Sequence, residues 1–266
     1  MLEPGSDRVD DTPEGLFIDI DAGDENVCGI RTDSTVVCWG SNGNPANPDN
    51  RSNPASSDGV DANTRFLAVS AGGLHACAIR TNGRVVCWGN GGSGRTDLER
   101  KNHAGLPSLL NETFLAIDVG WAHSCGIQTD KTLACWGWNG DNPSHNLVTG
   151  ALPGTFLAIA AGSRNTCALK TDNTLECWGS NDSNRNIAPG GNFLALGTGG
   201  AHSCAIKDDA NKTVECWGYG GNGRTTAPDG LTARTDLDVV WLSERTQIIK
   251  TTLRIKTKVY LEGALP

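Results

Sequence analysis

The sequence of 266 residues is poor in several residue types: Met occurs once, Tyr twice and Phe five times. It also has no excess of basic residues, because 22 Lys and Arg stand against 30 Asp and Glu, for a net charge of −8. A nucleic-acid or anionic-membrane partner requires a basic face, so neither is expected. No apolar run approaches the ~20 residues that cross a bilayer, and we predict no membrane span.

Glycine and cysteine, in contrast, are abundant, with 34 and 10 copies. A glycine in a helix interior costs roughly 1 kcal/mol relative to alanine, so this composition disfavours a helical protein. The composition predicts a turn-rich, all-β protein.

The cysteines define an internal repeat. They fall into five pairs, each followed by Trp-Gly: Cys28 and Cys38, Cys77 and Cys87, Cys125 and Cys135, Cys167 and Cys177, and Cys204 and Cys216. A phenylalanine stands eleven residues before each first cysteine: Phe17, Phe66, Phe114, Phe156 and Phe193. A glycine stands five residues before it: Gly23, Gly72, Gly120, Gly162 and Gly199. A sixth, decayed copy follows, in which Gln247–Lys250 aligns with Cys204–Lys207 and Val259-Tyr260 with Cys216-Trp217.

Each repeat has the pattern of short strands. Cys77–Arg80 and Arg84–Cys87 are apolar runs joined by the three-residue loop Thr81-Asn82-Gly83, with glycine at the left-handed position. A fourth run follows Trp-Gly, most clearly at Arg224–Pro228. Four short strands in each repeat are typical of propeller blades. We predict a single closed β-propeller of about six four-stranded blades over residues 16–266, after a polar lead-in at residues 1–15.

Residues Phe66–Gly89 resemble a repeat of the regulator of chromosome condensation family. Trp217–Pro228 is similar to the inter-repeat segment of the propeller-type β-lactamase inhibitor proteins. The resemblance extends over about residues 16–260 and implies a β-propeller, usually of seven blades in that family, whereas six repeats are counted here. Paired cysteines within a repeat depart from the nuclear members and resemble secreted bacterial members and some receptor-kinase ectodomains.

The spacing of each cysteine pair predicts a disulfide within a hairpin. In a three-residue-loop hairpin, Cys77 faces Cys87 across adjacent strands, within disulfide range. Free buried thiols and a zinc site are the alternatives, although zinc sites favour closer cysteine spacing and four converging ligands. Five disulfides require an oxidising compartment, so we expect a secreted protein or an ectodomain. The polar N-terminus carries no signal segment, so we expect either a fragment of a longer precursor or a removed leader.

Several residue patterns resemble sites but are interpreted as structural. His75, His123 and His202 share one repeat position with Asn26 and Asn165. A ring of metal or anion ligands is conceivable there, but we favour bonds from these side chains to the backbone of the preceding glycine turn.

The glycine strings Gly89–Gly94 and Gly218–Gly223 open no helix and are predicted to be turns. Asp19, Asp21 and Asp24 lack the closing Glu of a calcium loop. Four Asn-x-Ser/Thr sequons, at Asn50, Asn111, Asn181 and Asn211, permit glycosylation. We predict no cofactor, no metal and no catalytic residue.

The predicted function is a non-enzymatic, extracellular protein-binding module with a protein partner. A carbohydrate-binding, lectin-like propeller is the alternative, motivated by eight tryptophans, and an enzyme or a nucleotide-exchange factor like the nuclear family members is disfavoured by the cysteines. The candidate partner-binding residues are Trp121, Trp138 and Tyr219, which we expect to emerge on one face, with the two tryptophans as neighbours. The competing interpretation is that Trp138 folds back over its own blade.

Overall fold

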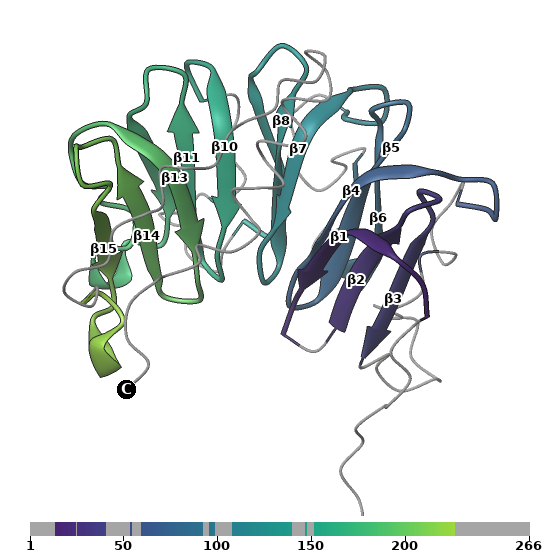
Figure 1. Cartoon of the computed structure of the whole chain (residues 1–266), viewed down its shortest axis with the longest axis horizontal. Helices are drawn as coiled ribbons and strands as arrows, with labels where there is room; N and C mark the ends of the chain where they lie inside the picture. The colour runs from purple at the N-terminus through teal and green to yellow at the C-terminus, as the bar shows by residue number, and fades with distance from the viewer. Residues whose placement is uncertain are drawn as a thin grey trace, which may run out of the picture.

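The protein forms an arc of five small sheets (Figure 1). The structure, a computed structural model, describes residues 14–24, 26–40, 54, 60–92, 96–98, 108–139, 147 and 152–226. Each sheet is one blade of three antiparallel strands in chain order. The strands are β1 (Phe17–Ala22), β2 (Asn26–Arg31) and β3 (Val36–Gly40) in blade 1; β4 (Phe66–Ala71), β5 (His75–Arg80) and β6 (Val85–Gly89) in blade 2; β7 (Phe114–Val119), β8 (His123–Gln128) and β9 (Leu133–Gly137) in blade 3; β10 (Phe156–Ala161), β11 (Asn165–Lys170) and β12 (Leu175–Gly179) in blade 4; and β13 (Phe193–Thr198), β14 (His202–Lys207) and β15 (Val214–Gly218) in blade 5.

The hairpin between the second and third strands has the predicted register. In blade 2, Cys77 lies opposite Cys87 and Ile79 opposite Val85. Gly83 ends the loop with a φ of +80°, which favours glycine. The same register brings the two cysteines of every other blade face to face.

The disulfide prediction is confirmed, and no described cysteine is free. Each blade holds one disulfide between its second and third strands: Cys28 with Cys38, Cys77 with Cys87, Cys125 with Cys135, Cys167 with Cys177, and Cys204 with Cys216. Cysteines of these disulfides also lie in the hydrophobic core between blades. Cys135 is buried in the cluster between blades 3 and 4, and Cys38 is partly buried against the cluster between blades 1 and 2.

The predicted fourth strand is wrong for the described residues. The glycine of every Trp-Gly pair has a φ between 102° and 107°, which turns the chain out of the sheet: Gly40, Gly89, Gly137, Gly179 and Gly218. In blades 4 and 5 the polar residues that follow form short 3-10 turns, η3 (Asp182–Asn184) and η4 (Gly221–Gly223). Arg224 and Thr225 continue as a turn, so Arg224–Thr226 is not a strand.

The hydrophobic core lies between consecutive blades. Between blades 2 and 3, Cys77 and Ile79 pack against Phe114, Ile117 and Trp136 of the next blade. The other three interfaces use the same repeat positions. This packing explains the repeated Phe and Trp: both bind each blade to the preceding one, and burying a side chain of this size contributes about 1.5–3 kcal/mol.

In blade 1 the same core-forming surface is exposed, because no described blade precedes it. Ile20 has the repeat position of Ile117, but its side chain is 50% exposed and that of Ile117 only 4%. The decayed sixth copy lies outside the described residues. The described residues therefore establish five three-stranded blades of the propeller type, and the predicted closed ring of about six blades rests on residues beyond them.

Candidate functional site

The candidate site is built on the turns that join the first and second strands of each blade. In blade 3, the N–H of Gly120 donates to the carbonyl of His123 at 2.8 Å, which closes the turn. Consecutive turns stack so tightly that a Cβ on the repeat glycine would lie well under 3.0 Å from the carbonyl oxygen of the next one. The stacked pairs are Gly23 on Gly72, Gly72 on Gly120, Gly120 on Gly162, and Gly162 on Gly199. Close approach of the backbones, and not a positive φ, therefore requires glycine at this repeat position.

Trp121 and Trp138 meet at the turn of blade 3. Trp121 follows Gly120 in the turn, and Trp138 follows the last residue of β9. The N–H of Trp138 donates to the carbonyl of Ala122 at 2.9 Å, which ties the end of β9 to this turn. The two rings pack edge to face, with centroids 6.3 Å apart and planes at 77°. Trp121 is 38% exposed and Trp138 is half-buried, so their predicted contact is confirmed.

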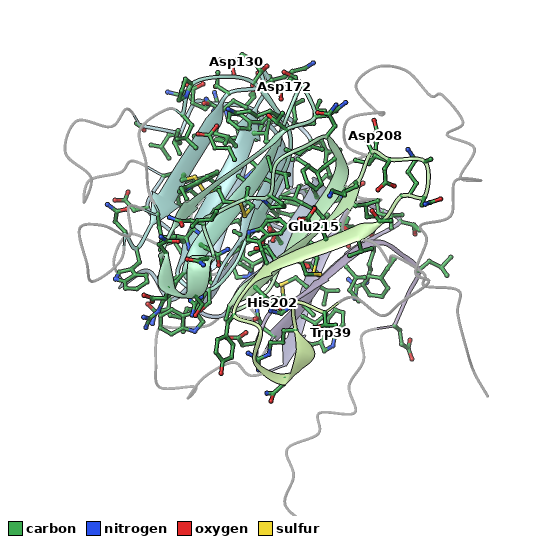
Figure 2. All side chains as sticks on the ribbon, turned by 90° about the vertical axis from the view of Figure 1, so that its left-hand side faces the viewer. Trp39, Asp130, Asp172, His202, Asp208 and Glu215 are labelled. Atoms are coloured by element: carbon green, nitrogen blue, oxygen red, sulfur yellow. A yellow bond between two sulfur atoms is a disulfide. The ribbon has the colours of Figure 1, made fainter. Side chains whose placement is uncertain are left out.

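Tyr219 has the position of Trp138 two blades later. Its N–H donates to the carbonyl of Ala201 at 2.9 Å, as the N–H of Trp138 does in blade 3. The ring is 46% exposed, and the guanidinium of Arg224 lies over it, 5.5 Å from the centroid. Figure 2 shows the two ends of the blades: Asp130 and Asp172 mark the hairpin loops at one end, and His202, which follows the turn, lies toward the other.

The turns of blades 1 and 2 extend the tryptophan pair. A Cβ on Gly73 would overlap Cδ1 of Trp121 and would lie 2.8 Å from Oδ2 of Asp24. The indole of Trp121 and the carboxylate of the exposed Asp24 therefore both fill the space where a side chain on Gly73 would lie. We call Asp24, Gly73, Trp121 and Trp138 the aromatic corner. Sequence reasoning missed Asp24 and Gly73 as parts of this site, although both directly follow a repeat glycine, as Trp121 does.

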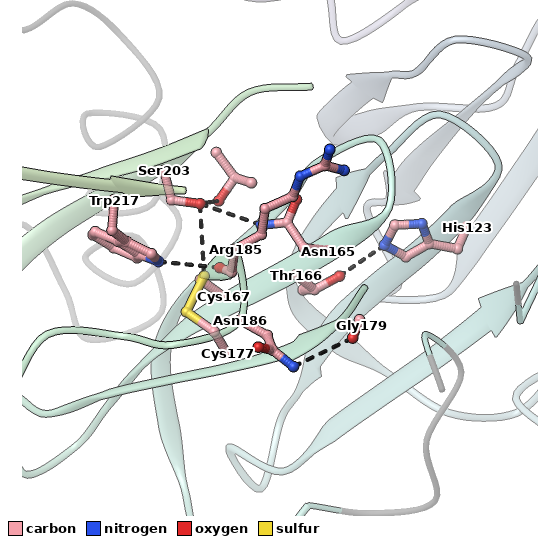
Figure 3. Close-up of a disulfide and its surroundings, with 11 residues drawn as sticks. His123, Asn165, Thr166, Cys167, Cys177, Gly179, Arg185, Asn186, Ser203 and Trp217 are labelled. Carbon is pink, nitrogen blue, oxygen red and sulfur yellow. Dashed lines mark hydrogen bonds between the residues drawn. A yellow bond between two sulfur atoms is a disulfide. The ribbon is translucent and has the colours of Figure 1, made fainter. Parts of the chain in front are cut away.

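In three of the five described blades the repeated His or Asn side chain bonds the next blade, and there the predicted bond to its own glycine turn is wrong. The N–H of the glycine is taken by the backbone carbonyl of the His or Asn residue, so the side chain reaches across the interface to a hydroxyl. Figure 3 shows two of these bonds beside the Cys167–Cys177 disulfide. The three pairs are His75–Ser124, His123–Thr166 and Asn165–Ser203, at 2.6, 2.7 and 3.3 Å.

The burial of His123 predicts a pH-dependent stability. Complete burial lowers the pKa of His123 from 6.5 to about 4. As the pH falls, the unfolded state therefore takes up the proton before the folded state does. The contribution of His123 to the free energy of unfolding is fully present above pH 6.5, and about 3 kcal/mol of it is lost as the pH falls toward 4. His123→Asn introduces the residue that blades 1 and 4 have at this repeat position. In this variant the free energy of unfolding, measured with urea, should depend less on pH across this window. If it fell with pH as steeply as that of the wild type, His123 would not be the source of the pH dependence.

Blade 2 lacks the hydroxyl that blades 3, 4 and 5 offer to the His or Asn side chain of the preceding blade. Asn26 is buried, and neither polar atom of its side-chain amide has a hydrogen-bond partner among the described residues, because the position of Ser124 is held by Ala76 in blade 2. An unpaired buried polar group is costly, so we expect Ala76→Ser to raise the free energy of unfolding by about 0.5–1.5 kcal/mol. Urea denaturation measures this, with Ala78→Ser, a buried position on the same strand, as the control. Equal effects of the two substitutions would refute the pairing.

Two of the aspartates with a superficial calcium-loop pattern accept hydrogen bonds from the first strand of the next blade. Asp19 and Asp21 accept the N–H groups of Val69 and Ala71 in the next blade, at 3.0 and 2.9 Å. Asp118 does the same for Ala161 of blade 4. These strands line a hollow of about 260 Å³, which is small for a ligand pocket. Within the described ranges, no three His, Cys, Asp or Glu residues gather to hold a metal ion.

The structure also describes parts of the two glycine strings and three of the four glycosylation sequons. The second glycine string ends in the 3-10 turn η4, as expected of a turn, while the first runs into residues outside the described ranges. Asn111, Asn181 and Asn211 of the sequons are exposed, and Asn50 lies outside the described residues. In the part of the chain that the structure covers, no helix has the length and apolar character to cross a membrane.

Comparison with known families matches four of the repeats. Residues 17–44, 66–95, 114–142 and 156–185 each match the regulator of chromosome condensation (RCC1) repeat. Blade 5 lies outside these ranges but has the same three strands and disulfide. A search of curated proteins found no match.

Solved structures with similar folds include plant receptor-kinase ectodomains. The ectodomain of the Physcomitrella patens receptor kinase CR4 is 25% identical, with a TM-score of 0.63, and the match covers 83% of this chain and 55% of that one. The CRINKLY WD40 ectodomain of Arabidopsis thaliana ACR4 is 26% identical, with a TM-score of 0.55, over 77% of this chain and 64% of that one. Prp20p of Saccharomyces cerevisiae, 19% identical with a TM-score of 0.61 over 79% and 59%, shares the fold. The chain thus spans less than two thirds of each of these structures.

Proposed function

The chain belongs to the RCC1 repeat family and carries a disulfide in every described blade, and from this premise we propose that it is a non-catalytic extracellular module that binds a protein partner through the aromatic corner. The two plant neighbours are ectodomains of receptor kinases, and their similarity to this chain suggests an extracellular interaction module. Five disulfides support the same compartment, because reducing compartments do not maintain them.

The exposed tryptophan pair is the observation that carries the proposal. In the described interfaces the tryptophans Trp88, Trp136 and Trp178 are buried between blades, whereas Trp121 is 38% exposed and lies outside these core clusters. The backbone holds both members of the pair in place through the bond from Trp138 to Ala122. Rigid exposed aromatic side chains dominate the binding energy of protein interfaces, since they bury much surface and lose little entropy.

Partner capture from an extracellular extract tests the proposal. The wild-type protein should retain a partner that Trp121→Ala and Trp138→Ala each lose by about tenfold or more in affinity. The matched control is Leu110→Ala, an exposed apolar side chain before β7, at the hairpin-loop end. Unchanged melting temperatures ensure that the variants are folded. Retained capture by both tryptophan variants would overturn the proposal, and binding confined to a glycan array would favour the lectin-like alternative.

A further inference from the structure

We propose that the aromatic corner binds a cationic side chain, arginine or lysine, of the protein partner. The inference rests on the proposed function and adds the chemistry of the group that is recognised. It stands on three observations: a cation already held by the equivalent aromatic ring, the absence of that cation from the repeat sequence of blade 3, and a carboxylate beside the pair.

Blade 5 contains the interaction that we propose. Tyr219 has the repeat position of Trp138, and its N–H makes the same bond to the turn. The guanidinium of Arg224 lies 5.5 Å from the centre of the Tyr219 ring, within the range of a cation–π interaction. The backbone at this repeat position therefore presents an aromatic ring in a way that admits a guanidinium.

Blade 3 has the stronger aromatic site but lacks the internal cation. Counting five residues on from the Tyr219 position gives arginine in three repeats: Arg95, Arg185 and Arg224. The corresponding residue after Trp138 is Pro143. Tryptophan attracts cations more strongly than tyrosine does, and here two indoles meet edge to face. The repeat with two tryptophans therefore supplies no arginine of its own at this position, and of the other four repeats only blade 1, with Ala46, shares this lack.

Charge favours the same ligand. The Asp24 carboxylate and the Trp121 indole edge both border the space that a side chain on Gly73 would fill, with the carboxylate oxygen 2.8 Å from its Cβ position, so a cation over the indole edge has an anion within reach. Gly73 has no side chain to block that approach. The net charge of −8 also accelerates encounter with a basic partner.

A tri-arginine peptide tests the inference on the intact protein. We expect it to shift the indole N–H resonances of Trp121 and Trp138, assigned through the Trp121→Ala and Trp138→Ala variants. The neutral analogue tri-citrulline should cause no shift. Asp24→Asn should weaken the binding of tri-arginine by about tenfold, and Asp182→Asn, an exposed carboxylate in η3 of blade 4, should leave it unchanged. Gly73→Ala, which forces Trp121 aside while keeping every aromatic group and charge, should also weaken binding.

The outcomes separate this inference from the proposed function. Equal shifts with tri-citrulline, or unchanged affinity in Asp24→Asn, would overturn the cationic ligand. If partner capture still depended on Trp121 and Trp138, the proposed function would survive that result. Capture that is independent of both tryptophans would overturn both.

Discussion

Gly120→Ala should destabilise the protein by about 3 kcal/mol or more, enough to prevent folding in many small domains. The added Cβ would overlap the carbonyl oxygen of Gly162 in the next blade, and it would lie 2.8 Å from Cε1 of His123. A carbonyl in a hydrogen-bonded turn cannot move aside as a flexible side chain can. The substitution would therefore separate two turns and disrupt the packing between blades 3 and 4.

A matched glycine controls for the intrinsic effect of the substitution. Gly200 lies in the corresponding turn of blade 5, and a Cβ there would meet no atom of the described residues within 4 Å. We expect Gly200→Ala to change the free energy of unfolding by less than about 1 kcal/mol. Chemical denaturation of the two variants gives the comparison. Similar stabilities would show that the stacked turns are not as close as the structure places them.

Removing one disulfide from the interior of the arc is the second large effect. Cys77→Ala with Cys87→Ala opens a loop of ten residues, and the loop-entropy relation assigns about 3 kcal/mol to a crosslink of this length. Cys77 is fully buried between blades, so its truncation adds a packing loss. Reduction of all five disulfides should unfold the protein at 37 °C, as is usual for small secreted domains.

Blade 5, the last of the described blades, supplies the control for this effect. Cys204 and Cys216 are half-buried, so removing that pair deletes a similar crosslink with less loss of packing. We expect Cys204→Ala with Cys216→Ala to cost less than the pair in blade 2, as measured by urea denaturation. A protein whose melting temperature was unaffected by reductant would contradict the stabilising role of the disulfides. Disulfide-linked peptides from different blades in a non-reduced digest would contradict the pairing.

The features predicted correctly from the sequence are those set within one repeat. The ten-residue cysteine spacing and the Asn82-Gly83 loop together determine the register in blade 2, and that register determines the disulfide. The contact of Trp121 with Trp138 also follows from one blade, because a turn and a strand end meet at the same end of a meander.

The features that were missed depend on how one blade sits on the next. His123 bonds Thr166 and Asn165 bonds Ser203, and sequence spacing within a repeat holds no information about such partners. The same is true of Asp24 and Trp121, which come from blades 1 and 3 and both lie against Gly73 of blade 2. The fourth strand failed for a local reason: glycine with a φ above 100° ends the third strand, and the polar residues after it favour turns.

A position-specific crosslinking measurement tests the central claim, that the partner binds at the end of the blades carrying the aromatic corner. A photoreactive phenylalanine analogue would be placed at Tyr219 in one protein and at Asn82, in the exposed hairpin loop at the opposite end, in another. After irradiation in the extracellular extract, the partner should be crosslinked from position 219 and not from position 82. Crosslinking from position 82 alone would place the partner at the hairpin loops and contradict the account.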